Sequence, residues 1–91
     1  MRNYEFTVIF AANDEMTEKG LEFVSGQFKA AGANVTKQED QGIKNFAYTI
    51  KKQEKGHYYY YELEADPQSV NKMSAEFLLQ DSIVKFLFVV K

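Results

Sequence analysis

The stretch from His57 to Ala65 constrains the fold most, because its side chains alternate between two kinds of surface. Aromatic and aliphatic residues fall on one face of an extended strand, and glutamates accompany tyrosines on the other. The first face carries Tyr59, Tyr61 and Leu63, and the second carries Tyr58, Tyr60, Glu62 and Glu64. The first face must therefore pack on a core, while the second is either solvated or covered by a partner.

Further stretches with strand or helix periodicity surround this segment. Strands are predicted over 4–10, 35–52, 57–65 and 83–90, with a polar turn over 52–56. Helices are predicted between the first two strands and between the last two. The order β-α-β-β-α-β predicts a single domain, residues 1–91, with a ferredoxin-like α+β fold. Right-handed crossovers place both helices on one face of a four-stranded antiparallel sheet and leave the other face open.

Local signals predict where the helices begin and end. The first helix is capped by Asp14 or Thr17, and Gly32 follows its last turn in the left-handed conformation. The second helix begins at Asp66-Pro67, with Asp66 as the cap. Gly42 marks either a β-bulge or a sharp bend in the second strand. The helices bury the stripes Leu21, Val24, Phe28 and Ala31, and Val70, Met73, Phe77 and Leu78.

The open face of the predicted sheet mixes aliphatic, aromatic and charged groups. A partner is one explanation for such a face, and ordinary solvated tyrosines are the other. A one-residue slip in register would exchange the two faces, but it would also bury Glu5, Glu62 and Glu64. The predicted open face carries Thr7, Ile9, Tyr58, Tyr60, Glu62, Lys85, Leu87 and Val89.

Composition excludes most catalytic chemistry. The 91 residues include no cysteine, which excludes disulfides and thiolate metal sites, and a single histidine, His57. No nucleophile elbow or glycine-rich phosphate loop is found, and neighbouring acids such as Glu39 and Asp40 point to opposite faces of a strand. We therefore expect no enzyme activity, metal, cofactor or small-molecule substrate. The absence of a long apolar run predicts a soluble cytoplasmic protein without a membrane contact.

The charge distribution is uneven although the net charge is −2. The segment from Lys37 to His57 contains five lysines and three acidic residues, which gives it a local excess of positive charge. This excess indicates a basic edge, although solvated lysines explain it equally well. The acidic total argues against nucleic-acid binding by bulk charge alone.

The tyrosines of the third strand suggest an RNA recognition motif as one alternative. Lys55-Gly56-His57-Tyr58-Tyr59 partly matches the basic-glycine-aromatic signature of that module. However, the signature would expose His57 and Tyr59, whereas the alternation buries Tyr59. A self-associating ferredoxin-like module that uses the open face is a second alternative.

Several segments spread over the whole chain resemble the bacterial small-subunit ribosomal protein S6 family. The most specific is Gly42–Lys51, in which a glycine, a lysine, an Ala-Tyr pair and an Ile-Lys pair keep a fixed spacing. Two residues depart from the usual pattern, because Phe46 replaces a leucine and Thr49 replaces a proline. Both are tolerated in a strand. The other matching segments are Met1–Glu5, Gly32–Val35, Gly56–Tyr58 and Phe88–Lys91.

The resemblance implies a structural role on the ribosome. Members of the family bind the central domain of 16S rRNA together with ribosomal protein S18, so a basic partner would supply much of the phosphate neutralisation. We expect the present chain to contact rRNA through its basic residues and its protein partner through the open face. For Tyr48 the two interpretations are stacking and packing against the bent strand, and we expect packing. The predicted rRNA contacts are Arg2, Lys44, Lys51, Lys52, Lys55 and Lys85, and the predicted partner contacts are Ile9, Tyr60 and Leu87.

Overall fold

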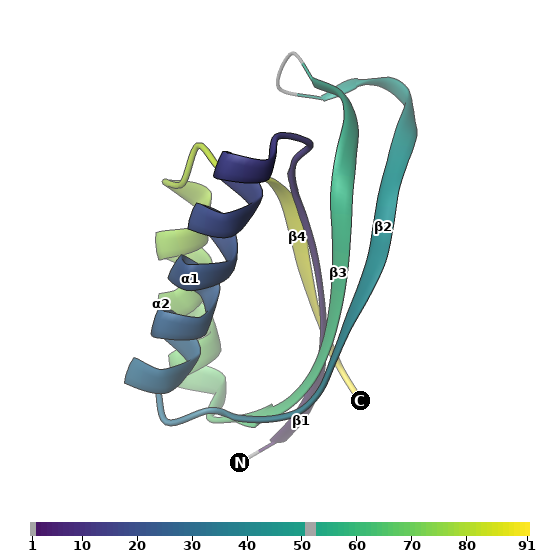
Figure 1. Ribbon diagram of the computed structural model, residues 1–91. Helices are drawn as coiled ribbons and strands as arrows, with labels where there is room; N and C mark the ends of the chain where they lie inside the picture. Colours follow the sequence, from purple (N-terminus) through teal and green to yellow (C-terminus); the bar gives the residue numbers. More distant parts are fainter. Residues whose placement is uncertain (1, 51–52) are drawn as a thin grey trace.

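Two helices cover one face of a four-stranded antiparallel sheet in the computed structural model, which describes residues 2–50 and 53–91 (Figure 1). The strand order is β2-β3-β1-β4. The predicted ferredoxin-like α+β fold is therefore confirmed. The elements are β1 (Arg2–Ala11), α1 (Asp14–Ala30), β2 (Asn34–Ile50), β3 (Gln53–Ala65), α2 (Pro67–Leu78) and β4 (Ile83–Val90).

An aromatic core lies between the sheet and the helices. Phe6, on the central strand β1, is fully buried and pairs with Tyr61 of β3 and Phe88 of β4. Its ring centre lies 4.3 Å from that of Phe88 and 5.4 Å from that of Phe77 on α2. The faces predicted from the alternation are confirmed, because Tyr59, Tyr61 and Leu63 are all buried.

The cap of α1 differs from the prediction by one residue. Asn13 is the N-cap, and its Oδ1 accepts hydrogen bonds from the backbone N–H groups of Glu15 at 3.0 Å and Met16 at 3.4 Å. Thr17 instead lies buried in the first turn, where its hydroxyl donates to the carbonyl of Ala11 at 3.0 Å. At the other end, Gly32 has φ 70°, as predicted for the residue after the helix.

Helix α2 begins where predicted, with Asp66 in the N-cap position and Pro67 as the first helical residue, but the side chain of Asp66 makes no capping hydrogen bond. Its buried stripe contains Val70, Met73 and Phe77. The prediction that Leu78 joins this stripe was wrong, because Leu78 is 68% exposed. Successive residues of a helix point about 100° apart, and Phe77 takes the inward position.

The β2–β3 hairpin extends past the ends of the helices (Figure 1). Lys44 pairs with Gly56, and Ile50 pairs with Gln53. The predicted turn over 52–56 was therefore wrong, because β3 already begins at Gln53 and the polar residues 53–56 belong to the strand. The predicted bulge is confirmed: the register shifts between Asp40 and Gly42, and Gly42 has φ 82°.

Candidate functional site

The helix-free face of the sheet exposes an apolar strip along the edge strand β4. Leu87 is 59% exposed and Val89 is 45% exposed. A shallow groove beside this strip is lined by Thr7, Ile9, Lys85, Phe86 and Leu87. Leu87 therefore lies where a partner can reach it, as the sequence predicts.

A second small core covers part of the same face. Ile9 is only 8% exposed, because it packs with Ala11 and Val84 under the rings of Phe46 and Tyr58. A Cβ atom added at Gly56 would stand 2.3 Å from Cγ2 of Ile9 and 2.7 Å from Cζ of Phe46, so the glycine makes this approach of the hairpin possible. Ile9 lies on the helix-free face as predicted, but little of its surface is available to a partner.

Tyr60 lies among charged side chains on this face. Both carboxylate oxygens of Glu62 have a cationic neighbour: Lys91 donates a hydrogen bond to Oε1, and Nζ of Lys37 lies 3.8 Å from Oε2. The hydrogen bond from Lys91 lowers the pKa of Glu62. Desolvation raises the pKa of Tyr60, and the charges of Glu5 and Glu62 raise it further. Tyr60 therefore keeps its proton and presents a hydroxyl donor beside carboxylates.

A polar cluster that the sequence did not reveal lies on the other face, at the bulge of β2. Oδ1 of Asp40 lies 2.7 Å from Nε2 of His57 and accepts from the backbone N–H of Gly42 at 2.8 Å. The hydroxyl of Tyr59 donates to Oδ2 at 3.2 Å. Tyr59 also has a raised pKa, mainly because it is buried and then because Asp40 is charged. The cluster joins β2 to β3 where the hairpin bends.

The predicted basic residues lie at two ends of the sheet. Lys44 and Lys55 are exposed in the hairpin, and Lys85 pairs with Ile9 on the same side of the molecule. Arg2 pairs with Ala65 at the opposite end of β1. Nine residues of strand separate the two ends of β1, which corresponds to about 30 Å. Lys51 and Lys52 lie outside the described residues. The described part of the set therefore places three lysines toward the hairpin end of the sheet, with Lys44 and Lys85 on opposite edge strands, and leaves Arg2 at the other end.

Tyr48 does not pack as expected. It is 71% exposed, and that prediction was wrong. The reason is that Phe46, two residues earlier, fills the packing position over Gly56 and Ile9.

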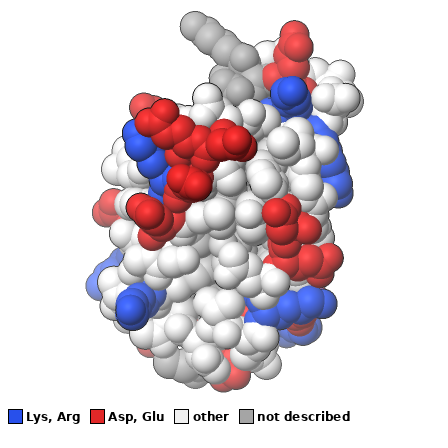
Figure 2. Space-filling view, viewed as in Figure 1, with Lys and Arg blue, Asp and Glu red and all other residues white. Residues whose placement is uncertain are grey.

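Charge is distributed unevenly between the elements. Figure 2 shows acidic side chains gathered over α1, where Asp14, Glu15, Glu18 and Glu22 are exposed. The lysines of the hairpin lie on β2 and β3, away from this group. The hairpin is therefore a more suitable site for an anionic ligand than the surface of α1.

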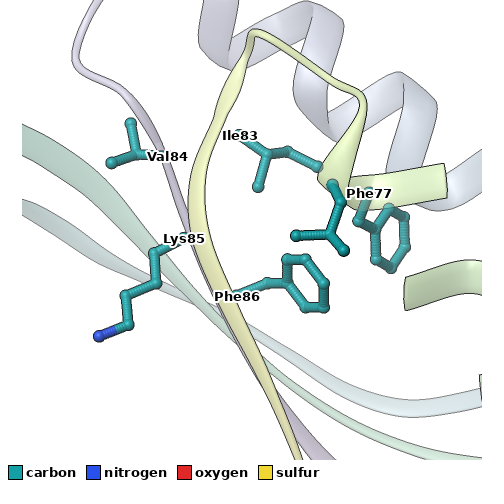
Figure 3. A pocket seen from close by; sticks show the side chains of 6 residues that line it. Phe77, Ile83, Val84, Lys85 and Phe86 are labelled. Carbon is teal, nitrogen blue, oxygen red and sulfur yellow. The ribbon is translucent and has the colours of Figure 1, made fainter. Parts of the chain in front are cut away.

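The groups needed for catalysis do not converge in the described residues. A hollow between α2 and β4 is lined by Phe77, Leu78, Ile83, Val84, Lys85 and Phe86. Figure 3 shows that Lys85, its charged member, points to the opposite side of β4 from Phe77 and Phe86. No group of three or more potential metal ligands occurs in residues 2–50 and 53–91, and neither helix there is long and apolar enough to cross a membrane.

A ferredoxin-like sheet with one open face and a lysine-bearing hairpin has the architecture of a binding module, and RNA recognition motifs are one class of module built on such a sheet. The family model described as "Ribosomal protein S6" matches residues 3–90. The chain therefore belongs to the ribosomal protein S6 family. It is a structural component of the small ribosomal subunit and is not an enzyme.

Relatives and solved structures agree with this assignment. The chain is 30% identical over 89 residues to the small ribosomal subunit protein bS6 of Treponema denticola, covering 98% of this chain and 96% of that protein. It is 33% identical over 96 residues to bS6 of Vesicomyosocius okutanii, covering 100% of this chain and 81% of that protein. The crystal structure of 30S ribosomal protein S6 from Thermotoga maritima matches with a TM-score of 0.88 and 26% identity, covering 99% of this chain and 87% of that one.

A more distant structure shares only the fold. The C-terminal domain of the MgtC protein from Mycobacterium tuberculosis matches with a TM-score of 0.68 at 11% identity, covering 100% of this chain and 88% of that one. This match shows that the same sheet and helix arrangement occurs in proteins of different sequence. Function therefore has to be argued from the surface residues of this chain.

Proposed function

We propose that the chain binds the central domain of 16S rRNA together with ribosomal protein S18. The observation that supports this most is the combination of a net charge of −2 with an exposed apolar strip on the open face. A chain with negative net charge gains little affinity for phosphate by itself. An apolar strip gives a basic partner a place to dock, and that partner then contributes the missing positive charge.

The open face has the chemistry that suits a basic partner. Leu87 and Val89 supply apolar area, Glu5 pairs with Val89 on the adjacent strand β1, and Tyr60 and Glu62 lie on β3, the next strand. Aromatic residues are favoured at the centre of interfaces, and carboxylates at the rim steer a positively charged protein into register. We assign Tyr60 and Leu87 to the partner contact, and Ile9 contributes mainly by supporting the surface from below.

The hairpin end of the sheet supplies the proposed rRNA contacts. Lys44, Lys55 and Lys85 are exposed there, and lysines without buried partners neutralise phosphates at little cost in desolvation. Lys51 and Lys52 belong to the same proposal by their position in the sequence. Arg2 makes a separate contact at the other end of β1, where its guanidinium suits bidentate binding of a phosphate.

Two sets of variants test the two halves of this proposal. Leu87→Asp places a charge in the apolar strip and should prevent heterodimer formation in sedimentation experiments, with no change in the unfolding transition because the side chain is exposed. Lys44→Gln should weaken rRNA binding by the heterodimer and reduce the slope of log affinity against log salt by about one. Lys72→Gln, an exposed lysine on α2, removes the same charge away from the hairpin and serves as control.

The same exposed strip also supports a second candidate function, self-association through the open face. A homodimer in sedimentation experiments, together with no affinity for 16S rRNA in the presence of S18, would favour that function and contradict the proposal.

A further inference from the structure

The most exposed aromatic side chain among the described residues belongs to Tyr48, near the end of β2. Its exposed fraction is 71%. Within residues 2–50 and 53–91, Tyr48 makes no ring contact, hydrogen bond or ion pair, unlike the neighbouring Phe46, whose ring centre lies 6.3 Å from that of Tyr58. The described residues therefore show no such contact by which the side chain of Tyr48 stabilises the fold.

The backbone of the hairpin contributes to this exposure together with the position of Phe46. Asn45 pairs with Lys55, and the next pair is Ile50 with Gln53. Four residues of β2, 46–49, thus lie opposite the single residue Glu54. This excess lifts the chain around Tyr48 out of the regular ladder and opens a shallow hollow lined by Asn45, Phe46, Ala47, Tyr48, Thr49 and Glu54.

The surroundings of Tyr48 favour RNA over protein as the occupant of this hollow. Lys44 and Lys55 lie on the two strands just before the bulge, and Nζ of Lys44 lies 5.0 Å from the ring centre of Tyr58. Lys44 pairs with Gly56 and Lys55 with Asn45, so the two lysines offer positive charge on opposite faces of the hairpin. Asn45 and Thr49 add polar groups that can hydrogen-bond to base edges. A protein-docking surface would instead show adjoining apolar residues, as β4 does with Leu87 and Val89.

We propose that the ring of Tyr48 stacks on an unpaired base of the RNA, while Lys44 and Lys55, one on each face of the hairpin, contact phosphates on either side of it. This inference rests on the proposed rRNA binding and adds the nucleotide conformation that the hairpin recognises: a base outside a duplex. Unpaired bases stack on aromatic side chains with little regard to sequence, since every base presents a π-face.

Affinity measurements with S18 and a central-domain rRNA fragment provide the first test. Tyr48→Ala should weaken rRNA binding by the heterodimer about tenfold or more. Tyr48→Phe should keep wild-type affinity, because it keeps the ring. Neither variant should change the salt slope, because no charge changes. Ile43→Ala, which shortens another exposed side chain on β2, is the matched control and should bind as wild type.

Fluorescence reports the stacking itself. The chain contains no tryptophan, so Tyr48→Trp introduces a single reporter, with the wild-type chain and S18 as the blank. The emission of the heterodimer with S18 should be quenched when the rRNA fragment is added, and S18 alone should leave the emission unchanged. Ile43→Trp should show no quenching.

Three other outcomes would overturn the inference. Wild-type rRNA affinity for Tyr48→Ala without quenching in Tyr48→Trp would leave the proposed function intact and remove the stacking contact. A spectral change with S18 alone, together with weaker heterodimer formation by Tyr48→Ala, would assign Tyr48 to the protein interface. Absence of rRNA binding by the wild-type heterodimer would reject the proposed function and this inference with it.

Discussion

Nε2 of His57 lies 2.7 Å from Oδ1 of Asp40, which joins β3 to β2 at the bulge of the hairpin. The backbone N–H of Gly42 and the hydroxyl of Tyr59 donate to the same carboxylate. The hydrogen bond with His57 is the largest cause that lowers the pKa of Asp40 below its ordinary value of 3.8. The bend of the hairpin is therefore tied to a charged carboxylate.

This relationship predicts a pH dependence of stability. A carboxyl group whose pKa is lower in the folded state stabilises the protein above its unfolded pKa, and the contribution is lost as the pH falls through the folded value. Asp40→Asn should therefore be less stable than wild type at about pH 7, and the difference should shrink toward about pH 3. Because Asp40 is exposed, solvent screening keeps the effect small.

Urea unfolding of both proteins at the two pH values measures this difference. Asp81→Asn, which alters an exposed carboxyl group in the α2–β4 connection, is the control. A constant difference between Asp40→Asn and wild type at both pH values would contradict the account of the bend.

Close packing of α1 on the sheet predicts opposite effects for two glycines of this helix. A Cβ atom at Gly20 would stand 2.3 Å from Cδ1 of the fully buried Phe10, whereas a Cβ atom at Gly26 would meet nothing within 4 Å. Gly20→Ala should lower the free energy of unfolding by about 1–3 kcal/mol through overpacking. Gly26→Ala should raise it by about 0.5–1 kcal/mol, because alanine favours the helix. Equal effects in denaturant titrations would contradict the packing described here.

The buried hydroxyl of Tyr61 predicts a neutral or stabilising substitution. Tyr61 is 1% exposed, its hydroxyl has no hydrogen-bond partner among the described residues, and burial raises its pKa to about 12. Tyr61→Phe should match or exceed wild-type stability, by up to about 2 kcal/mol, because it removes an unpaired polar group. Tyr59→Phe, which loses a hydrogen bond to Asp40, should cost about 0.5–1.5 kcal/mol. If thermal unfolding finds Tyr61→Phe the less stable of the two, the hydroxyl has a partner.

The second small core predicts that Gly56 tolerates no side chain. An added Cβ would come within 2.7 Å of both Ile9 and Phe46. Gly56→Ala should cost about 1–3 kcal/mol and should free the hairpin from the sheet face. Hydrogen exchange should then speed up at amides of residues 43–46 more than in the helices. Unchanged exchange in the hairpin would show that Phe46 does not anchor it.

Local periodicity was sufficient to predict the fold. The alternation through Tyr59, Tyr61 and Leu63 identified the buried face of β3, because a strand has a strict period of two. The cap of α1 was predicted at Asp14 or Thr17, one or four residues too late, since Asn13, Asp14 and Thr17 all have suitable side chains and only the backbone geometry selects among them.

The details of the site depend on contacts between distant residues, which local patterns do not encode. Asp40 and His57 are 17 residues apart and meet only because the bulge at Gly42 sets the register. The exposure of Tyr48 likewise follows from the position of Phe46 on Ile9. The predicted basic residues did not form one group, because Arg2 and the hairpin lysines occupy opposite ends of the sheet.

The affinity of the chain for a central-domain fragment of 16S rRNA, titrated with and without S18 at one fixed salt concentration, tests the central claim most directly. We predict weak binding by the chain alone and strong, salt-sensitive binding once S18 is present, with little affinity of the heterodimer for a fragment from another domain of the rRNA. Equal affinity with and without S18, or equal affinity for both fragments, would contradict the account.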